Sequence, residues 1–151
     1  MRRVPSSPYE LAQRFVGLKE VSGNMANPQI MAMLQLDADW PRDDSVPWCS
    51  AFVNYIAWLM RLPRSKSLRA RSWLAVGEPM KLDYAEPGFD VVILHRGKKW
   101  YGPEVMDAPG HVGFYAGWDG NKILVLGGNQ SDSVSLSSYD HAGLLGIRRL
   151  M

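Results

Sequence analysis

The stretch DDSVPWCSAFVNYIAWLM, residues 43–60, decides how the chain folds, because a polar loop here turns into a long apolar segment at the only cysteine. Apolar residues recur at intervals of three and four after Cys49, which is typical of a helix with one buried face. Pro63 ends this pattern, since proline interrupts a helix. We therefore predict a helix that begins at Cys49 and runs to about Arg61.

The residues before this stretch predict two further helices. Ser7 and Glu10 form a capping box, and Asn27 is a second capping residue; a proline follows Ser7 and Asn27 directly. Residues 65–77 predict a fourth, shorter helix, closed by Gly77. Helices thus fill the first half of the chain.

After Pro79 the pattern changes to short segments rich in β-branched and aromatic residues, separated by Gly, Asp and Asn. They are FDVVILHRG (89–97), HVGFYAGW (111–118), KILVLGGN (122–129), SVSLSS (133–138) and LLGIRRL (144–150). We read these segments as antiparallel strands. Helices followed by strands predict an α+β fold, with the N-terminal helices packed on one side of a C-terminal sheet.

Composition places the chain among ordinary globular proteins. Of its 151 residues, 46% are apolar and 21% are charged, which suits one core. A single Cys excludes an intramolecular disulfide and argues against cysteine-based zinc sites. Residues 1–17 contain no continuous apolar segment of the kind found in a secretory signal, and no apolar run approaches the roughly 20 residues that cross a bilayer. We expect a single domain over residues 1–151 without stable membrane insertion.

Charge adds little to this description. The formal net charge is +2, but five cations cluster in one short stretch: Arg61, Arg64, Lys66, Arg69 and Arg71. Such a run usually forms a solvated face, and the alternative is contact with an anionic partner. We expect a monomer that does not bind nucleic acid.

Two interpretations of Cys49 are open. A thiolate is a good nucleophile, and a helix N-terminus or a neighbouring imidazole lowers the pKa of a thiol. The N–H groups of the first helical turn have no partner within the helix, so they can also receive an oxyanion. The alternative is a small core residue, because free cysteine is among the most buried residue types.

Three histidines are available as a base. His95 ends a predicted strand and His141 lies in a loop, whereas His111 opens a strand between a glycine and an apolar run. A base has to sit on a rigid element within reach of the nucleophile. We therefore predict His111 as the base, against the alternative that it is structural.

The hairpin after His111 indicates which residue orients its ring. If the loop is the three residues 119–121, His111 lies opposite Asn129. A two-residue DG turn sets Gly128 opposite instead, and a two-residue GN turn sets Gln130 opposite. The type of turn therefore decides between Asn129, Gly128 and Gln130, and a further alternative is that GGNQ is merely a turn.

Four blocks of this sequence resemble cell-wall hydrolases of the CHAP type (cysteine, histidine-dependent amidohydrolase/peptidase), in particular a compact branch from phages and prophages. The blocks are PWCSAFVNYIAW (47–58), ARSWL (70–74), GHVGFYAGWDGNKILVLGGNQSDSVSLSSY (110–139) and LLGIRR (144–149). The resemblance spans about Glu20 to Arg149. It implies a papain-like, NlpC-like fold with Cys49 as nucleophile, His111 as base and Asn129 as the orienting residue. We further expect substrate contacts from Trp48, Ser50, Gln130 and Trp118.

One position departs from the family. Many CHAP domains have a glutamate where this chain has Gly127, so Gln130 remains an alternative to Asn129 as the third member. Some CHAP domains also bind calcium through aspartates ahead of the cysteine, and this chain has Asp37, Asp39, Asp43 and Asp44 there. Their spacing does not match an EF-hand, so we expect no metal and no cofactor.

The resemblance implies a peptidoglycan hydrolase that cuts an amide bond of the stem peptide, as a muramoyl-alanine amidase or as an endopeptidase. We expect a phage endolysin that stays in the host cytoplasm until release; a delivered antibacterial effector would share the chemistry. One alternative is a non-catalytic module that binds wall glycopeptide through Trp48, Trp100, Tyr101 and Trp118. Another is a cysteine protease or acyltransferase acting on protein.

Overall fold

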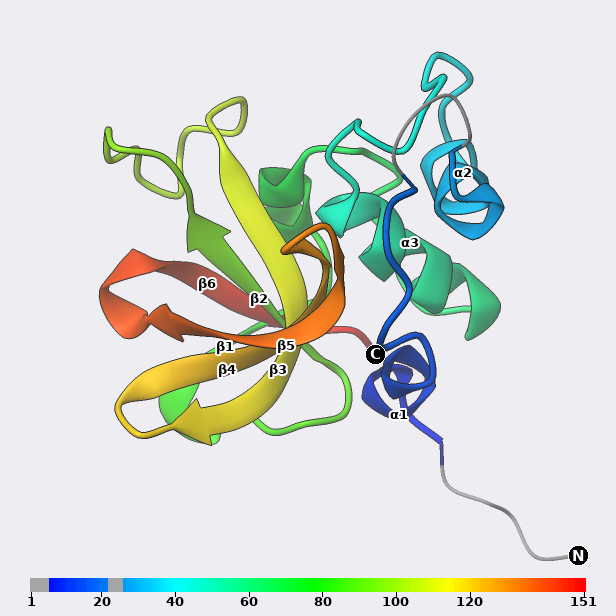
Figure 1. Ribbon diagram of the computed structural model, residues 1–151. Coiled ribbons are helices and arrows are strands. Elements are labelled where there is room, and N and C mark those ends of the chain that lie inside the picture. Colours follow the sequence, from blue (N-terminus) through cyan, green and yellow to red (C-terminus); the bar gives the residue numbers. More distant parts are fainter. Residues whose placement is uncertain (1–5, 22–25) are drawn as a thin grey trace, which may run out of the picture.

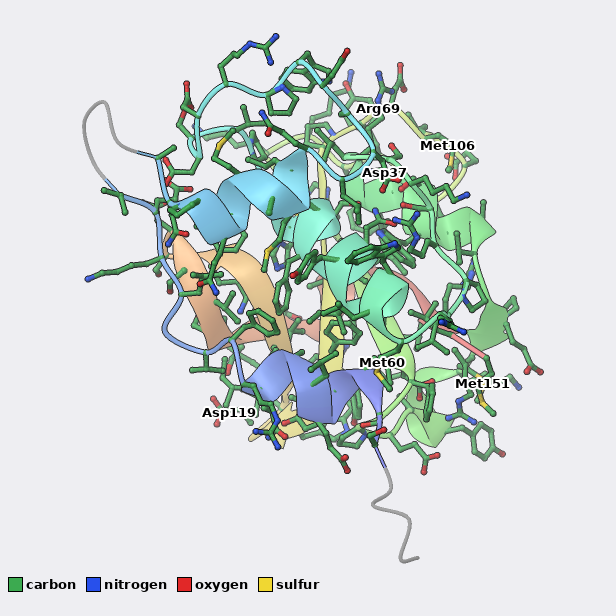
Figure 2. The ribbon with its side chains drawn as sticks, turned by 90° about the vertical axis from the view of Figure 1, so that its right-hand side faces the viewer. Asp37, Met60, Arg69, Met106, Asp119 and Met151 are labelled. Atoms are coloured by element: carbon green, nitrogen blue, oxygen red, sulfur yellow. The ribbon has the colours of Figure 1, made fainter. Side chains whose placement is uncertain are left out.

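The computed structural model describes residues 6–21 and 26–151, and places three helices beside one sheet (Figure 1). The helices are α1 (Pro8–Gln13), α2 (Pro28–Leu34) and α3 (Cys49–Leu59), with 3-10 turns η1 (Ala70–Ala75), η2 (Leu82–Tyr84) and η3 (His141–Gly143). Figure 2 shows the α-helices in front of the strands. No helix within the described ranges is long and apolar enough to cross a bilayer. Residues 1–5, part of the segment searched for a secretory signal, lie outside these ranges.

The predicted starts of α1 and α2 are confirmed. The Ser7 hydroxyl accepts a hydrogen bond from the Glu10 N–H at 3.2 Å, and the Asn27 side chain caps α2. The fourth helix is shorter than predicted, because only η1 forms. Asn54 of α3 fixes the backbone that leads into η1: its side chain accepts from the Lys66 N–H at 3.0 Å and donates to the Ser67 carbonyl at 3.1 Å.

The predicted antiparallel sheet is confirmed, and it has one strand more than expected. Its order is β1-β6-β2-β3-β4-β5, and every neighbouring pair is antiparallel. The strands are β1 (Glu78–Met80), β2 (Asp90–His95), β3 (Gly110–Asp119), β4 (Lys122–Gln130), β5 (Ser133–Asp140) and β6 (Leu144–Arg149). Sequence analysis missed β1, because a three-residue strand containing a proline gives no alternating pattern.

Of the three turns considered between β3 and β4, the two-residue turn of Gly and Asn is the one observed, since Asp119 pairs with Lys122. An irregularity at Ala116 then shifts the pairing by one residue, and a second one interrupts the β4–β5 ladder between Gly127 and Gln130. These irregularities decide which β4 side chains face His111, and the turn alone does not.

Each face of the sheet buries apolar side chains. On the helix side, Phe52 and Ile56 of α3 are fully buried with Phe114 of β3, and the rings of Phe52 and Phe114 meet edge to face with centroids 6.3 Å apart. On the other side a second cluster forms around Val92 and Tyr115. Burial on both faces explains why β2 and β3 read as nearly continuous apolar runs.

Gly128 lets the start of α3 approach the sheet closely. A Cβ atom at this position would lie 2.7 Å from the Trp48 ring and 2.8 Å from the Phe52 Cβ. These distances are shorter than atoms in contact can tolerate, and Trp48 and Phe52 are fully buried. The glycine therefore sets how near Cys49, which follows Trp48 directly, comes to the strands.

We predict that Gly128→Ala lowers the free energy of unfolding by about 1–3 kcal/mol, because overpacking forces buried side chains or backbone to shift. Urea unfolding followed by Trp fluorescence measures this change. Gly143→Ala is the matched control, since a Cβ there meets no atom within 4 Å. Equal midpoints for the two variants would contradict the argument.

Candidate active site

Cys49 is the first residue of α3, and its thiol is buried against β3. No side chain caps this end of the helix, and the side chain of Cys49 is only 4% exposed. Burial raises the pKa of the thiol, although hydrogen bonding from the Val112 N–H and the positive charge of Arg96 act in the opposite direction. The N–H groups of Cys49 and Ser50 at the start of α3 also lower the pKa, as expected for a helix N-terminus, but burial outweighs them and the resting group is a neutral thiol.

His111 precedes Val112 in β3 and lies in the same region as the thiol, because its neighbour Tyr139 is close enough to Cys49 for the charge of a thiolate to raise the pKa of the Tyr139 hydroxyl. It is 5% exposed, and its ring stacks on Tyr139 of β5 with centroids 5.3 Å apart. Burial lowers the pKa of His111 to about 4; the hydrogen bond to Gln130 raises it and the charge of Arg96 lowers it further. The imidazole is therefore neutral near pH 7 and able to accept a proton.

Gln130, at the end of β4, fixes which nitrogen of His111 carries the proton. Its Nε2 donates to the Ser135 carbonyl at 2.7 Å and to the Val125 carbonyl at 3.3 Å, so its Oε1 is the end that faces His111. Oε1 accepts from His111 Nε2 at 2.8 Å and from the Tyr139 hydroxyl at 2.9 Å. An amide oxygen only accepts, so Nε2 of His111 is protonated and Nδ1 is the free base.

Asn129 does not take the place predicted for it. Its backbone is left-handed, with φ of 56°, at the irregularity that interrupts the β4–β5 ladder. The described residues show no hydrogen bond between its side chain and His111, whereas Gln130 makes one. The two-residue GN turn that pointed to Gln130 is present, but the irregularity at Ala116 removes its one-residue shift before the strand reaches His111, so the turn does not account for the Gln130 contact.

Gly127 explains how Gln130 reaches His111. A Cβ at position 127 would lie 2.9 Å from Gln130 Oε1 and 3.4 Å from His111 Nε2. Position 127, where many CHAP hydrolases carry a glutamate, therefore points at the imidazole, and in this chain the Gln130 amide fills that space. The glycine at position 127 is what leaves room for Gln130 to contact His111.

Three side chains expected to bind substrate have other roles or places. Trp48 is fully buried, and its Nε1 donates to Glu20 Oε1 at 2.8 Å. Ser50 is fully buried as well: its hydroxyl donates to the Ser67 carbonyl at 2.6 Å and accepts from the Trp73 indole at 2.9 Å. Both residues hold the start of α3 in place instead.

Trp118 is exposed, but it lies at the far end of β3 from His111. Seven residues of a strand span about 23 Å. In Figure 2, Asp119, which follows Trp118, lies at the opposite end of the molecule from Arg69, a residue beside Cys49. Trp118 contacts His141, and it lines neither of the two hollows that lie beside Cys49 and His111.

Two hollows flank the pair of Cys49 and His111. The first, about 370 Å³, lies beside the imidazole and is lined by His95, Arg96, His111, Asn129, Gln130, Ser131, Ser137, Ser138 and Tyr139. The second, about 380 Å³, lies beside the thiol and is lined by Pro47, Cys49, Leu68, Arg69, Ala70, Arg96, Asp107, Ala108, Pro109 and Gly110. Arg96 lines both. A substrate crossing from one hollow to the other would pass the thiol and the imidazole.

A buried arginine that sequence analysis placed on a solvated face supports the second hollow. Arg71 is fully buried, and its guanidinium donates to four backbone carbonyls: Tyr101, Gly102, Val105 and Pro109. These carbonyls belong to the loop between β2 and β3, whose last residues wall the hollow beside Cys49. Arg71 thus fixes the loop that forms one side of this hollow. A run of basic residues in the sequence does not reveal such a buried role.

Three of the four aspartates considered for calcium have other partners. Asp37 pairs with Arg64 at 2.8 Å, Asp43 binds the Ser45 N–H at 2.9 Å, and Asp44 accepts from the N–H groups of Val21 and Asn27. Within residues 6–21 and 26–151, no group of three His, Cys, Asp or Glu side chains is arranged to hold a metal ion.

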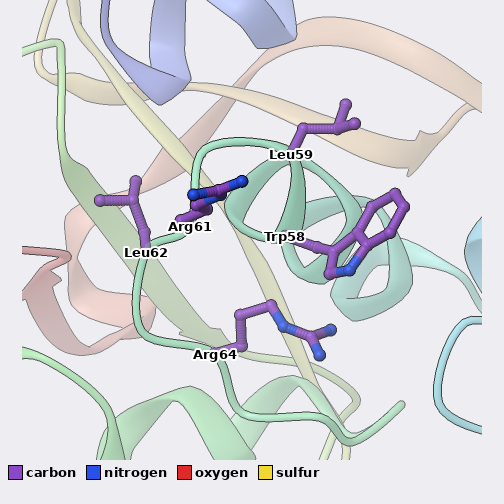
Figure 3. Close-up of a pocket in the computed structure, with 5 residues that line it drawn as sticks. All are labelled: Trp58, Leu59, Arg61, Leu62 and Arg64. Atoms are coloured by element: carbon purple, nitrogen blue, oxygen red, sulfur yellow. The ribbon is translucent and has the colours of Figure 1, made fainter.

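A further hollow, of about 400 Å³, lies where α3 ends (Figure 3). It is lined by Trp58, Leu59, Arg61, Leu62 and Arg64. Trp58 is nine residues beyond Cys49, which corresponds to about 14 Å along a helix. This hollow is therefore separate from the thiol.

Comparisons with known proteins bear on the fold. No family model matches the sequence, and neither does any curated protein. Among solved structures, the chain is similar to NlpC1 from Trichomonas vaginalis, with a TM-score of 0.59 and 14% sequence identity. The similarity covers 98% of this chain and 46% of that one, so the chain spans about half the length of the solved protein. The expected α+β, NlpC-like fold is confirmed.

We predict that acid destabilises the protein through His111. Its pKa is lowered from 6.5 to about 4 on folding, so the unfolded chain binds the proton more readily. Its contribution is fully present above pH 6.5 and is lost as the pH falls towards 4, by about 3 kcal/mol in total. Urea unfolding at several pH values should show a shallower acid slope for His111→Gln than for the wild type.

The matched control for this slope is His141→Gln, because His141 is an exposed residue of η3. It should keep the wild-type acid slope. If His111→Gln keeps that slope too, the imidazole does not have the depressed pKa described above.

Proposed function

We propose that this protein is a cysteine hydrolase that cleaves an amide bond in the stem peptide of peptidoglycan, as a muramoyl-alanine amidase or as an endopeptidase. One observation carries the proposal: Gln130 Oε1 accepts the Nε2–H of His111, which leaves Nδ1 as the basic nitrogen in the region of the Cys49 thiol. Within residues 6–21 and 26–151, Nδ1 makes no hydrogen bond and is free to take a proton.

The reaction follows from these groups. Cys49 Sγ attacks the carbonyl carbon while the thiol proton passes to His111 Nδ1, and the oxyanion is received by the Cys49 N–H at the uncapped start of α3. The C–N bond breaks as Nδ1 returns the proton to the leaving amine. Water, deprotonated by the same Nδ1, then hydrolyses the thioester. Throughout, Gln130 keeps the ring in place.

The choice of peptidoglycan as substrate rests on likeness. The sequence resembles CHAP hydrolases, and the fold is similar to a protein named NlpC1. We propose that a monomer acts on the wall as a phage endolysin does, from the host cytoplasm after release; a delivered effector would use the same site. Two of the aromatics invoked for the wall-binding module do not suit it, since Trp48 is buried and Trp118 lies away from the hollows, whereas Trp100 is exposed and packs on His95 of the hollow beside His111.

We predict that wild-type protein releases soluble fragments with new termini from purified peptidoglycan and that Cys49→Ala releases none, because the thioester cannot form. Mass spectrometry of the released fragments identifies the bond. Circular dichroism of the variant should match the wild type, since the substitution removes only one buried atom. Equal release by Cys49→Ala would overturn the proposal, and cleavage of casein but not of peptidoglycan would favour a protease.

We predict that Gln130→Ala lowers kcat by about 10–100-fold, because losing one charge-assisted hydrogen bond costs about 1.5–3 kcal/mol. Asn129→Ala is the matched control and should stay within about threefold of the wild type, a difference under about 1 kcal/mol. The double variant Gly127→Glu/Gln130→Ala should regain activity, since position 127 points at His111 Nε2 and the deleted amide leaves room for a carboxylate. A larger loss for Asn129→Ala than for Gln130→Ala would restore the prediction made from sequence.

A further inference from the structure

Arg96 follows β2 directly and is the one residue that lines both the hollow beside His111 and the hollow beside Cys49. Its side chain is exposed. Within residues 6–21 and 26–151 it forms no ion pair and no hydrogen bond, whereas Arg64, Arg71 and Arg149 are each held by protein oxygens. Arg96 is thus a guanidinium in the site that folding leaves without a partner.

The two hollows differ in charge. The hollow beside Cys49 contains Asp107, a carboxylate, as well as Arg96 and Arg69. The hollow beside His111 has no carboxylate among its lining residues, and Arg96 is its only permanent cation. An anionic group therefore finds unopposed positive charge only on the His111 side.

Neutral polar side chains around this hollow are also free to bind. The side chains of Asn129, Ser131 and Ser137 make no hydrogen bond within the described part of the chain, and the buried Nδ1 of His95 has no partner there either. A guanidinium and several unused polar groups around one hollow suit a carboxylate, which accepts several hydrogen bonds and pairs with arginine in a two-pronged geometry.

The direction of proton transfer determines which half of the substrate lies in the hollow beside His111. His111 gives its proton to the departing amine, so the amine half of the scissile amide has to lie beside the imidazole. The acyl half stays attached to Cys49 Sγ, beside the other hollow. We propose that Arg96 recognises a carboxylate on the residue that leaves as the amine, so that the substrate is a peptide with a free acid on the amine side of the cleaved bond.

This inference rests on the proposed function and makes its substrate class narrower. Arg96 is also close enough for its charge to lower the pKa values of Cys49, His111 and Tyr139. That proximity supports the placement of the guanidinium at the centre of the site. It also means that a loss of activity in an Arg96 variant would not by itself demonstrate substrate recognition.

The test therefore compares two substrates on one enzyme. Once the released fragments identify the bond, two synthetic stem peptides that span it are prepared, differing only in a free carboxylate or a carboxamide on the residue that leaves as the amine. Wild-type kcat/KM should be about 10–100-fold higher for the carboxylate, the range of a charge-assisted hydrogen bond. Any effect of Arg96 on Cys49 or His111 changes the rates on both peptides equally, so it cancels in the ratio of the two kcat/KM values.

In Arg96→Gln this ratio should fall to within about threefold of one, because the charge that distinguishes acid from amide is gone. Lys98→Gln is the matched control: it removes an exposed cation two residues away that lines neither hollow, and it should keep the wild-type ratio. A second peptide pair that differs on the acyl side should give the same ratio in the wild type and in Arg96→Gln.

The outcomes separate the two proposals. Equal wild-type rates on the carboxylate and the carboxamide, or an unchanged ratio in Arg96→Gln, would overturn the role of Arg96 and leave the hydrolase intact. If the wild type cleaves neither synthetic peptide nor purified peptidoglycan, the proposed function fails and the inference fails with it.

Discussion

The contact between Trp48 and Gly128 is the constraint on which the site depends. Trp48 is anchored to Glu20 and packs where any side chain at 128 would stand, so α3 begins almost in contact with β4. Cys49 is consequently pressed against β3, where the Val112 N–H reaches its sulfur. A helix set further from the sheet would leave the thiol exposed and away from His111. The packing of the core and the assembly of the site are therefore the same event.

Burial has a chemical consequence for this pair. It raises the pKa of the Cys49 thiol and lowers that of His111, so both groups are uncharged at rest. A buried neutral pair avoids the cost of desolvating a thiolate and an imidazolium. Charge separation is thus deferred until a substrate carbonyl is in place to receive the electrons of the sulfur, and the resting thiol is protected from other electrophiles.

Sequence patterns predicted the elements that are determined by interactions between residues close together in the chain. The caps at Ser7 and Asn27, the start of α3 at Cys49 and the five longer strands all follow from rules that act within a few residues. The partner of His111 does not, because two irregularities in the ladders, at Ala116 and before Gln130, shift the register by amounts that no turn motif encodes. The inward direction of Trp48 and Ser50 likewise depends on distant residues, Glu20 and Trp73.

The Gln130 amide gives His111 a lower pKa than a carboxylate partner would give it. A glutamate at position 127 would stabilise the imidazolium and raise the pKa of His111, whereas an amide orients the ring without adding charge. In the proposed reaction, His111 is therefore a weak base towards the thiol but, once protonated, a strong acid towards the leaving amine. Because amines are poor leaving groups until they are protonated, the low pKa of His111 would assist C–N cleavage more than thiol activation. Arg96 acts in the same direction, because its charge also lowers the pKa of His111.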